Sequence, residues 1–152
     1  MVYNKLMRSG LVIFILLALV SCTSLKSKFD SSIQYYVNYF ERSFDHKVTV
    51  PITFGDLPDN VVGMCYFFKG PKPLRFIILD SGYWEKSAVW ERELLVFHEL
   101  GHCEFDLEHD NTVIPGVFTY QPGSMMFPYL FWEYSKERSF YIDELRKKRA
   151  GF

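Results

Sequence analysis

The sequence predicts a small domain of the α+β class. Residues 31–44 and 87–103 repeat their apolar side chains at helical spacing, and a third helical stretch closes the chain at about 134–149. Between the first two lie short runs rich in β-branched and aromatic residues, separated by Gly and Pro. At 152 residues, with 49% hydrophobic residues, the chain fits one domain that can bury a respectable core.

The N-terminus predicts export. Lys5 and Arg8 precede an apolar run at 11–20, which is too short to span a bilayer comfortably and is typical of a signal peptide, residues 1–21. Residues 19–22 (LVSC) resemble the lipobox of bacterial lipoproteins.

The lipobox resemblance implies that Cys22 is lipidated and becomes the mature N-terminus. Residues 22–28 would then be the lipidated cysteine and a polar tether, and 29–152 the folded domain. The protein would lie in the bacterial cell envelope, at the outer membrane because Thr23 stands where aspartate would direct retention. The alternative is an ordinary signal peptide with a chance cysteine, or an uncleaved anchor.

The charge of the mature part argues against a nucleic-acid partner. Without the leader, 15 basic residues stand against 18 acidic ones, a formal net charge of −3. The basic cluster at 146–149 favours a helix terminus over a lipid-binding patch. We expect a monomer.

The first helix begins with a capping box, Ser31 followed three residues later by Gln34. The residues expected to face the sheet are Ile33, Val37, Phe40 and Phe44.

Three strands are expected next. Residues 47–54 alternate but contain Pro51, which favours an edge position or a bulge. Residues 61–68 form the second strand, and the break at 69–73 leads to a third at 74–80. The third run is almost continuously apolar, so we expect it at the centre of the sheet.

The main helix is expected from about residue 87 to 103. Gly101 costs about 1 kcal/mol of helix propensity relative to Ala, so we infer close packing against another backbone there. Residues 110–123 are interpreted as a loop without regular structure. In the last helix, the residues expected to face inward are Tyr141, Ile142 and Leu145.

The main helix carries the pattern H-E-x-x-H at 98–102. His98 and His102, four apart, lie on one face of a helix, about 5–6 Å apart at Cβ, and can hold one metal ion. Glu99 lies beside them, where a carboxylate can take a proton from a water that attacks a carbonyl.

A catalytic zinc takes three protein ligands, and His109 is the candidate for the third. On a continuing helix His109 would be roughly 10 Å beyond His102, so the chain must turn back. Asp106 is well placed for that turn, because Asp tolerates the left-handed conformation.

These residues resemble the metzincin zinc peptidases, whose pattern is H-E-x-x-H-x-x-G-x-x-H followed by a Met-turn. Ser124-Met125-Met126 is similar to that turn, which implies that Met126 lies beneath the metal. In strict register the third ligand would be Glu108, with Phe105 at the turn; a shift by one residue gives His109 and Asp106. In a further alternative, the third metal ligand is a glutamate on a later helix, such as Glu137 or Glu144.

The resemblance implies a compact metzincin-like domain with an N-terminal helix, a small twisted, mostly parallel sheet with an antiparallel edge strand, the active-site helix, the Met-turn and a C-terminal helix. It also implies one zinc ion, peptide-bond hydrolysis with Glu99 as general base, and a peptide or protein substrate bound along 61–68. A catalytically idle, zinc-binding envelope lipoprotein is the alternative function.

Two cysteines remain once Cys22 carries lipid. In an exported protein Cys65 and Cys103 could form a disulfide, and free buried thiols are the alternative. His46 lies in a charged context and is expected at the surface.

Overall fold

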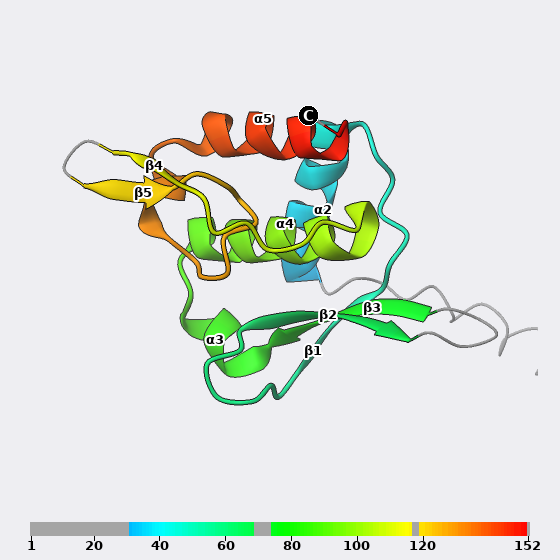
Figure 1. The fold of residues 1–152 in the computed structure, drawn as a ribbon. Helices are drawn as coiled ribbons and strands as arrows, with labels where there is room; N and C mark the ends of the chain where they lie inside the picture. The colour runs from blue at the N-terminus through cyan, green and yellow to red at the C-terminus, as the bar shows by residue number, and fades with distance from the viewer. Residues whose placement is uncertain (1–30, 69–73, 117–118, 152) are drawn as a thin grey trace, which may run out of the picture.

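The computed structural model describes residues 31–68, 74–116 and 119–151. The predicted signal peptide, Cys22 and the tether lie outside the described residues. The fold is a small α+β arrangement in which α4 lies between a three-stranded sheet and α5, with α2 beside it (Figure 1).

The first helix, α2, spans Ser31–Phe44, as predicted. Its expected apolar face is confirmed, because Ile33, Val37, Phe40 and Phe44 are all buried. Phe40 packs edge-on against Phe97 of α4, with ring centroids 5.1 Å apart. Helix α2 therefore covers one side of the helix that carries the H-E-x-x-H pattern.

The main sheet has the order β1-β3-β2. Its strands are β1 (Ile52–Gly55), β2 (Gly63–Phe68) and β3 (Leu74–Asp80). The central position of β3 is confirmed. Strand β1 pairs with β3 in parallel, and β2 pairs with β3 in antiparallel. The expected antiparallel edge strand is therefore present, but the sheet is mixed, whereas a mostly parallel sheet was expected. Strand β2 is an edge strand.

The prediction of a strand from 47 to 54 was too long. Only the last part pairs with β3, because the backbone amides of Thr49 and Val50 donate instead to the Glu104 carboxylate, at 2.6 and 2.9 Å. Glu104 comes from α4, more than fifty residues later. A side chain therefore replaces the neighbouring strand as acceptor.

Two helices follow β3: the short α3 (Ser81–Lys86) and α4 (Val89–Phe105). Helix α3 was not expected. It forms because the Asp80 carboxylate caps its N-terminus by accepting a hydrogen bond from the Tyr83 amide at 2.7 Å. Helix α4 begins slightly later and ends slightly later than predicted.

The expectation that 110–123 has no regular structure was wrong. Strands β4 (Val113–Pro115) and β5 (Tyr120–Pro122) pair in antiparallel as a separate two-stranded sheet. Each strand of such a sheet is an edge strand, where proline is tolerated. Pro115 and Pro122, at the ends of these strands, are therefore compatible with the sheet.

The C-terminal segment holds a short 3-10 helix, η1 (Trp132–Ser135), and then α5 (Arg138–Arg149). The final helix thus begins later than expected, but its predicted inward face of Tyr141, Ile142 and Leu145 is buried. Among residues 31–68, 74–116 and 119–151, no helix combines the length and apolar character needed to cross a membrane.

Candidate metal centre

Helix α4 places His98 and His102 side by side. Their spacing of four residues brings the two Nε2 atoms within 3.1 Å of each other. Both rings point toward the same cavity, and His98 is buried while His102 is partly buried. The local periodicity of the helix is sufficient to create this pair.

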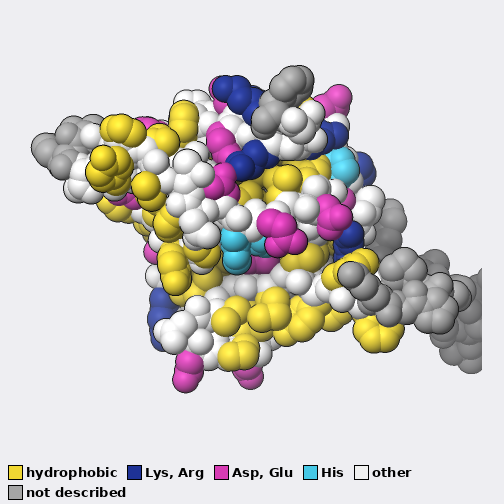
Figure 2. Space-filling model, viewed as in Figure 1, with side chains coloured by type: hydrophobic (Ala, Val, Ile, Leu, Met, Phe, Trp, Pro, Cys, Tyr) yellow, Lys and Arg dark blue, Asp and Glu magenta, His cyan; other side chains and the backbone are white. Residues whose placement is uncertain are grey.

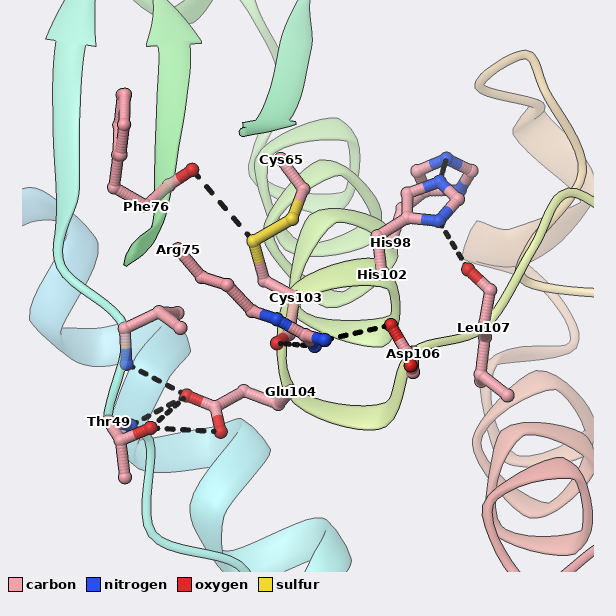
Figure 3. Close-up of a disulfide and its surroundings, with 11 residues drawn as sticks. Thr49, Cys65, Arg75, Phe76, His98, His102, Cys103, Glu104, Asp106 and Leu107 are labelled. Atoms are coloured by element: carbon pink, nitrogen blue, oxygen red, sulfur yellow. Dashed lines mark hydrogen bonds and ion pairs between the residues drawn. A yellow bond between two sulfur atoms is a disulfide. The ribbon is translucent and has the colours of Figure 1, made fainter. Parts of the chain in front are cut away.

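His109 joins the pair because the chain reverses after α4. Asp106 adopts the left-handed conformation, with φ 59° and ψ 30°, and Arg75 holds its carboxylate at 3.0 Å (Figure 3). The reversal brings Nε2 of His109 within 3.2 Å of Nε2 of His98. The ligand atoms of the three histidines all lie within 4.8 Å of one another, and Glu108, exposed like His109, is not part of this cluster.

The tautomers of two of these histidines suit a metal. Nδ1 of His98 lies 3.0 Å from the carbonyl oxygen of Met125, and Nδ1 of His102 lies 2.5 Å from that of Leu107. A carbonyl only accepts, so each Nδ1 carries the proton and each Nε2 presents a lone pair. Two facing lone pairs cannot hydrogen-bond to each other, and a cation between them resolves this conflict.

Burial favours the neutral, metal-binding form of the His98 and His102 imidazoles. It lowers the pKa of His98 to about 4, and it also lowers the pKa of His102. The residues present therefore fit a divalent ion of the kind that imidazole prefers, among which zinc is common. The identity of the ion does not follow from the geometry.

Glu99 is buried beside the histidines and lines the same cavity. Burial raises the pKa of its carboxyl to about 8, and the backbone amide of Cys65 opposes that rise. Gly63 makes room for it: a Cβ there would lie 2.8 Å from Oε1 of Glu99 and 2.7 Å from Cδ1 of Leu95. This role of Gly63 was not predicted from the sequence, because the contact joins β2 to α4.

Met126 lies against the histidine helix, and no part of its surface is exposed. A Cβ at Gly101 would come within 2.6 Å of its sulfur. Close packing at Gly101 was expected against a backbone, and the neighbour is instead this side chain. Ser124 closes the turn, since its hydroxyl accepts from the Met126 amide at 3.0 Å.

The glutamates of the last helical segment are engaged elsewhere. Glu144 accepts a hydrogen bond from the backbone amide of Met125 at 3.0 Å, and Glu137 accepts from Gln121 at 3.0 Å. Neither belongs to the histidine cluster. The reading with a third ligand from a later helix therefore has no support in the geometry.

Cys65 and Cys103 form a disulfide with a Cα–Cα distance of 5.6 Å (Figure 3). It ties edge strand β2 to the last turn of α4, one residue after His102. His46 takes no part in the cluster: its Nε2 lies 2.9 Å from Oε2 of Glu104, and its side chain is about one quarter exposed.

A cavity of about 690 Å³ opens in front of the histidines. Its lining includes the start of β2 with the loop before it, and the segment at 127–130. Figure 2 shows histidine side chains exposed at the centre of this face, with hydrophobic side chains along the strand below them. The volume of this cavity lies within the range of ligand-binding pockets in proteins.

Comparisons of the chain with protein-family models, curated proteins and solved structures gave no match. A proposal about function therefore depends on the histidine cluster and the cavity around it.

Proposed function

We propose that this protein is a zinc-dependent peptidase of the metzincin type, tethered to the bacterial envelope through a lipid on Cys22. One observation carries the enzymatic part: three convergent imidazoles and a buried glutamate share an open cavity. A structural zinc site normally has four protein ligands and is closed, whereas a catalytic site has three and leaves a position open. The cluster described here has three.

A zinc ion held by His98, His102 and His109 would supply a Lewis acid that polarises the scissile carbonyl. Glu99, ionised when the positive charge of that ion opposes the rise in its pKa, accepts a proton from the water whose oxygen attacks the carbonyl carbon. It then gives that proton to the leaving amine nitrogen as the carbon–nitrogen bond breaks. One residue thus acts as base and then as acid, and the proton count balances.

Strand β2 supports a peptide as the substrate. The Asp80 amide donates to the carbonyl of Val62 at 3.0 Å, so the main-chain groups of Gly63 and Cys65 face away from β3. Residues 60–65 line the cavity. An extended peptide can add to such an edge as a further strand, with main-chain hydrogen bonds providing the affinity.

The alternative function is a zinc-binding envelope lipoprotein that does not catalyse. Glu99 argues against it. This carboxylate is 5% exposed, and it has no cationic partner in the described part of the chain. A buried carboxyl group without a charged partner costs stability, and a site that only binds zinc would not require one.

The test uses the full-length protein in detergent, loaded with zinc and incubated with a peptide library. We expect cleavage that a chelator abolishes. Glu99→Gln should keep one zinc per protein and lose hydrolysis by at least about 100-fold, because it removes the proton carrier and no ligand. Glu108→Gln, at an exposed carboxylate on the same cavity, is the matched control. Undiminished hydrolysis by Glu99→Gln would reject the mechanism.

A further inference from the structure

We propose that Glu144 and Lys148, one turn apart on α5, are positioning residues that set the affinity of the histidine cluster for its metal. The inference rests on the metal-binding part of the proposed function and not on peptide hydrolysis. Neither side chain touches a histidine. Each acts through a loop residue: Glu144 through Met125, which contacts His98, and Lys148 through Asp110, which follows His109 in the chain.

Glu144 acts on His98 through the backbone of Met125. Its Oε2 accepts from the backbone amide of Met125 at 3.0 Å, and the carbonyl of the same residue accepts from Nδ1 of His98 at 3.0 Å. The carboxylate therefore holds the residue whose carbonyl orients the His98 ring and sets its tautomer. Partners of this kind, outside the ligands themselves, tune the affinity of metal sites.

Lys148 acts on His109 through the next residue in the chain. Its Nζ lies 2.6 Å from Oδ2 of Asp110. The Asp110 amide also donates to the carbonyl of Met126 at 2.9 Å. The residue that follows His109 is thus held to α5 by its side chain and to the Met-turn by its backbone, which limits the positions that the His109 ring can take.

The contacts made by Glu144 and by Lys148 depend on each other. Oε1 of Glu144 is buried without a hydrogen bond, and the Lys148 ammonium lies 3.5 Å from it. Removal of Lys148 would leave this buried carboxylate oxygen with no compensating charge and would weaken the hydrogen bond that the Met125 amide donates to Glu144. We therefore expect the effects of changing the two residues to be non-additive.

The experiment measures zinc affinity of the full-length protein in detergent by competition with a chromophoric chelator. Glu144→Ala should raise the Kd for zinc about 10-fold, within the range for partners of metal ligands. Glu144→Gln keeps an oxygen that can accept from the Met125 amide and should stay within about threefold of the wild type. Lys148→Met should resemble Glu144→Ala, and the double variant should show less than the product of the two effects.

Lys147→Met is the matched control, because it removes the same charge from an exposed neighbouring position. The melting temperature of each metal-free variant and the absorption spectrum of its cobalt-loaded form separate positioning from simple stabilisation. A lower melting temperature with unchanged Kd and spectrum would overturn the inference. If Glu144→Ala does not fold, Lys148→Met and Glu144→Gln decide by the same criteria. A wild-type protein that binds no zinc would overturn the metal site itself, and this inference with it.

Discussion

Removal of the Cys65–Cys103 disulfide is expected to lower the free energy of unfolding by about 4 kcal/mol. The bond joins residues 38 apart in sequence. In the chain-entropy description, a cross-link costs the unfolded chain about 3 kcal/mol for a 15-residue loop and about 4.7 kcal/mol for 100 residues, and a loop of this size falls between them. A domain of this size is stable by about 5–15 kcal/mol in total, so the effect is a large share.

The assay is urea unfolding of the wild type and of the Cys65→Ala/Cys103→Ala double variant, each carrying Cys22. Alanine avoids a new polar group at Cys103, which is 2% exposed. We expect the midpoint to fall and the slope to increase, because the unfolded chain without the cross-link is less compact and exposes more surface. A loss below about 1 kcal/mol would refute the reasoning, since the loop would then not limit the unfolded chain.

The same double variant should leave zinc binding nearly unchanged but should loosen strand β2 beside the histidine cluster. The three histidines of the cluster lie on α4 and the segment after it, so zinc affinity should change little. Strand β2 loses its covalent link to α4, so Gly63 and the Cys65 amide would be held less firmly against Glu99. If the peptidase proposal holds, we expect KM for peptides to rise more than kcat falls, measured from initial rates.

Three other changes are informative. His109→Ala should abolish tight zinc binding, whereas Glu108→Ala should leave it nearly normal; metal content after dialysis decides, and the reverse outcome would restore the strict register. Gly63→Ala should destabilise the protein by about 1–3 kcal/mol in urea unfolding, because its Cβ would lie 2.8 Å from Oε1 of Glu99; an unchanged midpoint would mean that β2 shifts freely. Cys22→Ala should move the protein from the membrane fraction to the soluble fraction after leader cleavage; sedimentation checks this, and persistent membrane association would reject the lipobox.

Some features followed from the sequence because they depend on near neighbours. The pairing of His98 with His102 needs only the helical repeat. The reversal at Asp106 needs only a residue that tolerates the left-handed conformation, and the structure shows it with φ 59°. The burial of α2 and the central place of β3 follow from runs of apolar residues. Zinc, peptide hydrolysis and the lipid anchor remain predictions.

Other features were decided only by tertiary structure. Residues 47–51 alternate like a strand, yet the Glu104 carboxylate on α4 takes the amides of Thr49 and Val50. The strands β4 and β5 have three residues each, too few for alternation to be recognised.

The partners of the site also lie far apart in sequence. Glu144 meets Met125 across 19 residues and His98 meets Met125 across 27, while the disulfide spans 38. Sequence periodicity reports which face of an element is buried, but not which distant element covers it. The sequence therefore determined the residue types of the histidine cluster and their local spacing. The packing of β2, of residues 124–126 and of α5 around α4 decided how those residues are held.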